Sequence, residues 1–166
     1  MESRRRALRG HTSSVEGALL LRDGRLLSWS HDSTLRIWNM QSGQCLVILS
    51  GHRHGVLGAL QAEDGNVLSW AWDQTARLWN CETGACIRAF QGHDSSDGSL
   101  SLYGVTNLDA DQIVTYGHDA TIRIWRWSGE LVAILRGHDS PVGGVIVLRD
   151  KMILSWSSGS YFFSAF

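Results

Sequence analysis

Four Gly-His pairs recur along this chain of 166 residues, and they begin 41, 41 and 45 residues apart, at Gly10, Gly51, Gly92 and Gly137. Each pair is followed by a Ser or Thr, and the first three units add an Asp four residues later and a Trp six residues after that. A fixed period of this size indicates a chain built from repeated supersecondary units that stack on their neighbours. The period therefore predicts a repeat array across residues 1–166.

The repeat boundaries follow from the Gly-His pairs. The units are expected at residues 10–50, 51–91 and 92–136, with a partial unit at 137–166. The third unit carries a five-residue insertion from Asp94 to Gly98. In the fourth unit Gly159 and Ala165 stand where Asp and Trp are due.

Each of the first three units predicts four short strands separated by turn residues, so we expect an all-β fold. In the first unit the strands are expected at residues 15–20, 26–30, 34–38 and 44–49. The first strand recurs at 56–61, 102–107 and 142–147. Residues 4–9 are similar to the end of a unit and predict an orphan outer strand, while the fourth unit lacks one.

Large aromatic side chains recur at one position of the second strand, at Trp29, Trp70, Tyr116 and Trp156. Successive side chains of a strand point to opposite faces of the sheet. The other face of this strand therefore carries the Ser or Thr of each unit. We expect the aromatic set to pack between neighbouring units.

The period, the Gly-His opening and the Trp close of each unit resemble the WD40 repeat, the blade of a WD-type β-propeller. The resemblance implies four-stranded blades, about four per chain. In that family the His, the Ser or Thr, the Asp and the Trp form a hydrogen-bonded set. The matching positions here are His11, Ser28, Asp32 and Trp38; His52, Ser69, Asp73 and Trp79; and His93, Thr115, Asp119 and Trp125.

Ser, His and Asp also serve in nucleophilic catalysis, but the pattern here argues against an enzyme. A nucleophile needs an exposed oxygen and an oxyanion hole. The sets occur three times, and no Gly-x-Ser-x-Gly motif is present. The three cysteines form no Cys-x-x-Cys pair, so neither a metal nor a cofactor is predicted. An enzyme with a site at the central channel stays an alternative, with His31 and His118 as its candidates.

Charge and composition exclude other classes of function. The net charge of −1 gives no field that would favour nucleic acid, and no run of eighteen apolar residues could span a membrane. The N-terminus has no apolar segment typical of a secretory signal. With unpaired thiols and no leader, a cytoplasmic location is expected.

The two ends of the chain complement each other, because one has a spare outer strand and the other lacks one. The hypothesis is a homodimer in which two chains exchange these strands and close an eight-bladed ring. Two alternatives stay open: a fragment or sensing module of a larger WD-repeat signalling protein, and a closed four-blade monomer.

The resemblance implies a scaffold that binds a protein or peptide partner. Its contact face bears the loop before the first strand and the turn between the second and third strands. Exposed aromatic side chains on such a face are good anchors for a partner. The candidates are Glu16, His31, Leu57, Trp72, Tyr103 and His118.

Overall fold

The computed structural model of the chain describes residues 7–93, 102–157 and 164–165. These residues form three four-stranded antiparallel sheets and one three-stranded sheet, each built from strands that are consecutive in the sequence. The all-β expectation is confirmed. The orphan strand at 4–9 is only partly described, and residues 7–9 are not in a strand.

The four sheets are called blades 1 to 4. Blade 1 comprises β1 (Val15–Leu20), β2 (Leu26–Ser30), β3 (Thr34–Trp38) and β4 (Cys45–Ser50). Blade 2 comprises β5 (Val56–Gln61), β6 (Val67–Ala71), β7 (Thr75–Trp79) and β8 (Cys86–Gln91). Blade 3 comprises β9 (Leu102–Asn107), β10 (Gln112–Gly117), β11 (Ile122–Arg126) and β12 (Leu131–Leu135). Blade 4 comprises β13 (Val142–Val147), β14 (Ile153–Ser157) and β15 (Ser164–Ala165).

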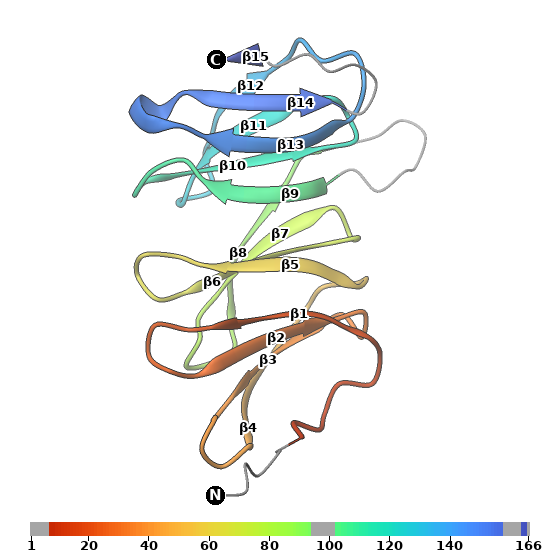
Figure 1. Cartoon of the computed structure of the whole chain (residues 1–166), viewed down its shortest axis with the longest axis vertical. Helices are drawn as coiled ribbons and strands as arrows, with labels where there is room; N and C mark the ends of the chain where they lie inside the picture. The colour runs from red at the N-terminus through yellow and green to blue at the C-terminus, as the bar shows by residue number, and fades with distance from the viewer. Residues whose placement is uncertain (1–6, 94–101, 158–163, 166) are drawn as a thin grey trace, which may run out of the picture.

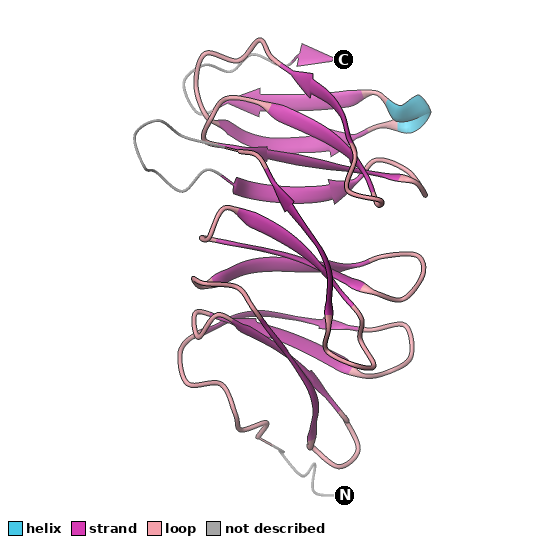
Figure 2. Ribbon diagram, turned by 180° about the vertical axis from the view of Figure 1, so that it is seen from behind, coloured by secondary structure: helices cyan, strands magenta, loops and turns pink. Residues whose placement is uncertain are grey.

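The blades stand in an open row, with blade 1 and blade 4 at opposite ends (Figure 1). The inner strands β1, β5, β9 and β13 contact one another in that order. Seen from behind, the same row shows a 3₁₀ helix at Arg149–Lys151, between β13 and β14 (Figure 2). The single chain is therefore an open arc, and the alternative of a closed four-blade monomer is wrong for this structure.

Three apolar clusters fill the spaces between neighbouring blades. The first joins Leu27, Leu35 and Ile37 of blade 1 to Val67 and Trp79 of blade 2. Successive side chains of a strand point to opposite faces. Blade 1 therefore contributes Leu27 and Trp29 from one face of β2, and blade 2 contributes Val67 and Ala71 from the opposite face of β6. Each inner blade is thus covered on both faces, and hydrophobic burial holds the row together.

Each inner strand carries a glycine beneath the aromatic residue of the next strand. Gly58 pairs with Trp70, and a Cβ atom at Gly58 would lie 2.2 Å from Trp70 Cζ2. The same arrangement recurs at the pairs Gly17–Trp29, Gly104–Tyr116 and Gly144–Trp156. Trp29, Trp70 and Tyr116 pack against the clusters between blades, as the sequence predicts. The glycines let these rings lie flat across their own sheets.

Two sequence predictions differ from the structure by one residue. The outer strand of blade 1 covers Cys45–Ser50 rather than 44–49. In blade 4 Leu154 pairs with Ala165, as Leu27 pairs with Ile37 in blade 1. Ala165 therefore occupies the position of Ile37 and not that of Trp38, because the connection between β14 and β15 holds one residue more than in other blades. The insertion at 94–98 and Gly159 lie outside the described residues.

Candidate functional site

The His, Ser, Asp and Trp of blade 2 form one hydrogen-bonded chain. His52 Nδ1 lies 2.9 Å from Asp73 Oδ2, and His52 Nε2 lies 2.8 Å from Ser69 Oγ. Trp79 Nε1 donates to the same Ser69 oxygen over 2.8 Å. An ionised carboxylate only accepts and an indole only donates, so a neutral imidazole with its proton on Nδ1 satisfies every member. The chain ties the loop before β5 to β6, β7 and the turn between them.

The structure brings together the equivalent residues of blades 1 and 3 in the same way. In blade 1 His11 contacts Asp32 and Ser28, and Trp38 donates to Ser28, all within 2.9 Å. In blade 3 His93 contacts Asp119 and Thr115, and Trp125 donates to Thr115, all within 2.9 Å. In blade 4 His138 Nε2 still lies 2.7 Å from Ser155 Oγ. We call these four-residue chains the blade networks.

The three complete blade networks also include a threonine two residues after the Asp, which the sequence did not predict. The hydroxyl of Thr75 donates to Asp73 Oδ1 over 2.7 Å, and Thr34 and Thr121 do the same to Asp32 and Asp119. The backbone N–H of the residue after His also donates to the Asp in blades 1 and 2. The recurrence of Thr at this position was the available signal. Each Asp therefore accepts several hydrogen bonds.

These hydrogen bonds outweigh the cost of burying a carboxylate. Burial by itself raises the pKa of Asp73, but the hydrogen bonds from His52, Arg53 and Thr75 lower it well below its ordinary value. The pKa values of Asp32 and Asp119 are lowered against burial in the same way. A carboxylate that accepts several N–H and O–H groups is stabilised in its charged form. The three Asp side chains are therefore ionised at neutral pH.

The hydroxyl groups of the blade networks are not placed as nucleophiles. Ser28, Ser69 and Thr115 are buried, and each oxygen already accepts an indole N–H. In the part of the chain that the structure describes, no three His, Cys, Asp or Glu side chains are grouped so as to hold a metal ion. The arrangement serves to lock strands in register.

The predicted contact residues lie along one edge of the row of blades, which we call the bulge edge. Glu16, Leu57 and Tyr103 are skipped in the pairing of their strands, so each is the extra residue of a β-bulge. A bulge re-aims a side chain and commonly occurs beside functional sites. The other members follow the second strand of their blades. The bulge edge comprises Glu16, His31, Leu57, Trp72, Tyr103 and His118.

Side chains of the bulge edge contact each other within and between blades. The ring of His31 lies against that of Trp72 in the next blade, with centroids 4.7 Å apart. His31 Nε2 lies 3.4 Å from Glu16 Oε1. Tyr103 and His118 form an edge-on pair within blade 3, with centroids 6.0 Å apart. Trp72 and Tyr103 still keep 36% and 41% of their surface exposed.

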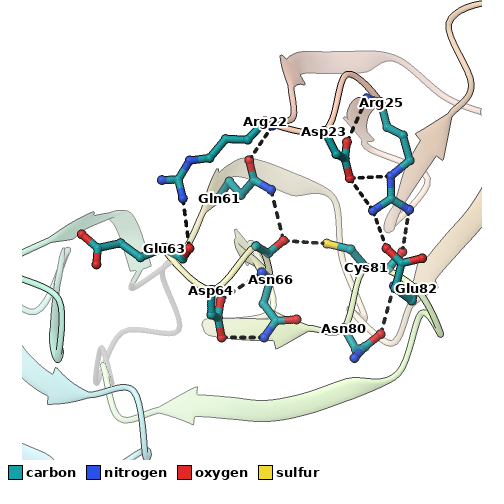
Figure 3. A pocket seen from close by; sticks show the side chains of 11 residues that line it. Arg22, Asp23, Arg25, Gln61, Glu63, Asp64, Asn66, Asn80, Cys81 and Glu82 are labelled. Atoms are coloured by element: carbon teal, nitrogen blue, oxygen red, sulfur yellow. Dashed lines mark hydrogen bonds and ion pairs between the residues drawn. The ribbon is translucent and has the colours of Figure 1, made fainter.

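A polar pocket of about 500 Å³ lies at the opposite edge, between blades 1 and 2 (Figure 3). Its arginines already bind across the two blades: Arg22 donates to the carbonyl of Glu63, and Arg25 pairs with Glu82 over 2.6 Å. Cys81 lines the pocket as a buried thiol, and burial raises its pKa to about 11. The sequence did not predict this pocket. The contacts of its arginines brace blade 1 against blade 2.

Comparison with known proteins decides the family. The family model described as "WD domain, G-beta repeat" (WD40) matches residues 2–39, 43–80 and 84–126, which is more than half of the chain. The chain belongs to the WD40 family. The resemblance stated from the repeats is thereby confirmed.

Two solved structures share the fold over most of this WD40 chain. The crystal structure of the computationally designed Ika4 protein is 25% identical, with a TM-score of 0.80, and the match covers 96% of this chain and 94% of that one. The WD40 β-propeller domain of Doa1 is 23% identical, with a TM-score of 0.68, and covers 89% of this chain and 48% of that one.

Curated relatives match only a short part of the WD40 chain. Apoptotic protease-activating factor 1 of Homo sapiens is 50% identical over 36 residues, and that of Rattus norvegicus is 49% identical over 37 residues. Each match covers 22% of this chain and 3% of the relative.

WD40 domains generally serve as protein-interaction scaffolds. No helix among the described residues is both long and apolar enough to cross a bilayer.

Proposed function

We propose that this WD40 chain is a non-catalytic scaffold that binds a protein or peptide partner through the bulge edge. The observation that carries the proposal is the row of aromatic and imidazole rings that three bulged strands and three turns bring to one edge. Aromatic side chains fixed on a rigid sheet lose little conformational entropy on binding, and interfaces are enriched in them.

The contacts within the bulge edge support this role. The ring of His31 contacts both the carboxylate of Glu16 and the ring of Trp72. The backbone N–H of Trp72 donates to Gly55 over 3.0 Å, which fixes the turn to the loop before β5. Pre-ordered side chains cost less to immobilise when a partner binds.

The double variant Trp72→Ala/Tyr103→Ala is expected to lose the partner, because it removes the two large exposed rings. Proteins cross-linked to the chain in cell extract would be quantified by mass spectrometry for the native chain, this variant and the matched control Met40→Ala/Met152→Ala. Met40 and Met152 are more exposed than Trp72 and Tyr103 and lie at the opposite edge. We expect a loss of about tenfold or more for the double variant alone. Equal retention by all three proteins would contradict the proposal.

We also propose that the chain self-associates. The outer faces of blades 1 and 4 are exposed, whereas the equivalent faces between neighbouring blades are buried. Val15 is 55% exposed, whereas Val56 and Val142, at the same repeat position, are fully buried under the preceding blade. At the other end Leu148 is 40% exposed, whereas the equivalent Leu21 is 2% exposed. The N-terminal end face comprises Val15, Ala18, Leu20 and Leu26, and the C-terminal end face comprises Ile146, Leu148, Leu154 and Trp156.

A second copy supplies the matching surface for each end face. The interior interfaces join the aromatic face of one blade to the Ser and Trp face of the next. Blade 4 offers the first kind of face and blade 1 the second. Two open arcs related by a two-fold axis would close an eight-bladed ring. Residues 4–9 would add to β15 of the other copy as the missing outer strand.

The native chain is expected to sediment at micromolar concentration with twice its mass of 18.4 kDa. Val15→Glu would place a charge in the interface and is expected to give single chains. Ile87→Glu is the matched control, because Ile87 lies exposed on an outer strand away from both end faces. A native chain that sediments alone would overturn the dimer and favour a module whose end faces are covered by further blades of a longer protein.

The same proposal includes a cytoplasmic location. The three cysteines, Cys45, Cys81 and Cys86, form no disulfide in the structure. Free thiols are typical of proteins that work in a reducing compartment. This supports the location predicted from the sequence.

A further inference from the structure

We propose that Arg53 and Arg77 of blade 2 form a subsite for an oxyanion, a carboxylate or phosphate group carried by the partner. The two side chains line a cavity of about 120 Å³ beside the bulge edge. Its remaining walls come from Asp73, Thr75, Ala89 and Gln91. A cavity of this size is on the scale of one acidic group rather than of a whole ligand.

The guanidinium groups that line the cavity are largely uncommitted. Among the described residues the side chain of Arg53 makes no hydrogen bond and no ion pair, and only its backbone N–H is used, by Asp73. Arg77 uses Nε on Thr75 at 3.2 Å and has a weak contact from Nη1 to Cys86 Sγ at 3.9 Å. An oxyanion between two such groups would receive charge-assisted hydrogen bonds, which are the strong ones.

The carboxylate of Asp73 does not itself act as the oxyanion that pairs with the two arginines. Its oxygens already accept from His52, Thr75 and the backbone of Arg53, and its side chain is 3% exposed. Arg77 Nε lies 4.0 Å from Asp73 Oδ2, at the limit of an ion pair. With one buried carboxylate and two arginines, the cavity keeps one net positive charge.

No other blade combines these features. The residue after the Gly-His pair is Thr12 in unit 1, Asp94 in unit 3 and Asp139 in unit 4. In blade 3 the counterpart of Arg77 is Arg123, whose Nη2 is bound to Asp119 Oδ2 over 3.1 Å. The pair of available arginines therefore distinguishes blade 2 from its otherwise equivalent neighbours.

The subsite adjoins the bulge edge through two backbone links. Asp73 directly follows Trp72, and the loop that carries Arg53 is bonded to Trp72 at Gly55. A partner that places an apolar side chain against Trp72 would bring its neighbouring acidic side chain to the arginines. That the oxyanion belongs to a partner rests on the proposed function. That the two arginines bind an oxyanion does not.

The test is a titration of the full chain, labelled with ¹⁵N, with sodium phosphate and separately with sodium acetate, at constant ionic strength maintained with chloride. The arginine Nε–H signals of Arg53 and Arg77 are followed by NMR. We expect saturable shifts with phosphate, and about tenfold weaker binding in Arg53→Gln. The matched control Arg136→Gln removes another exposed arginine charge, directly after β12 of blade 3, and is expected to bind within about twofold of the native chain.

Saturation by both anions would support a site for carboxylates and phosphates alike, and saturation by phosphate alone would support a site for phosphate groups. Linear, unsaturated shifts, or equal weakening by Arg53→Gln and Arg136→Gln, would overturn the subsite. Because the probes are simple anions, such a failure leaves the test of the bulge edge intact. Conversely, the bulge-edge proposal fails if Trp72→Ala/Tyr103→Ala keeps its partner. That failure would not affect anion binding, which we expect to stay saturable in this variant because Arg53 and Arg77 are unchanged.

Discussion

Trp79→Ala is expected to lower the free energy of unfolding by about 5 kcal/mol, a larger effect than we expect from Gly58→Ala or Trp79→Phe. The indole is fully buried in the cluster between blades 1 and 2, so its removal leaves a cavity. The substitution also removes the indole N–H that donates to Ser69 Oγ, the same oxygen that contacts His52. Urea unfolding followed by circular dichroism measures the change, since the far-ultraviolet signal of the sheets does not depend on tryptophan fluorescence.

Two further variants separate the causes. Trp72→Ala is the matched control, because this ring lies at the surface against His31, and we expect a loss of less than about 1 kcal/mol. Trp79→Phe keeps most of the buried ring and removes the N–H, so we expect a loss of about 1–3 kcal/mol. Should Trp79→Ala not fold, the phenylalanine variant still measures the network. Equal stability of Trp79→Phe and the native chain would show that the blade network contributes nothing through its indole.

Gly58→Ala is expected to destabilise the chain by about 3 kcal/mol. The new methyl group would lie 2.2 Å from Trp70 Cζ2 and 2.6 Å from Cε2, so the indole must leave its place against the cluster between blades 2 and 3. The backbone at Gly58 is ordinary strand, and the effect is therefore one of space and not of conformation. Thermal and urea unfolding would measure it.

Gly143→Ala is the control for this experiment. Gly143 lies on β13 next to Gly144, the counterpart of Gly58, and a methyl group there would meet its nearest neighbour at 3.5 Å, an ordinary contact. We expect less than about 1 kcal/mol, since alanine also restricts the unfolded chain. A Gly58→Ala protein as stable as Gly143→Ala would show that the Trp70 ring is not confined by its own strand.

Much of the fold follows from local sequence. The first three strands of blade 1 begin and end at the predicted residues, because alternation and turn residues act over a few positions. The members of the blade networks could be named because the resemblance to the WD40 repeat implies them at matching positions of three units. Ala165 was misplaced because the connection before it is one residue longer, and an offset counted along the chain cannot detect a lengthened connection.

The candidate site was predicted only in part. The sequence placed Glu16, Leu57 and Tyr103 near one edge, but it did not show that a bulge turns each of them out of the strand pairing. It also missed the cavity of Arg53 and Arg77, since these residues come from a loop and a strand 24 positions apart. Both depend on contacts between segments that are distant in the chain.

The sequence alone determined the unit of this protein: four strands, their order and the polar residues that lock them, because those interactions lie within one repeat. Only the tertiary structure decided how the units stand together. It left Val15 and Leu148 uncovered at the ends of an open row, although Val56, Val142 and Leu21, at the same repeat positions, are buried. The physical reason is that burial depends on which blade lies against a face, and a residue in a repeat has the same sequence neighbours whether or not that blade is present.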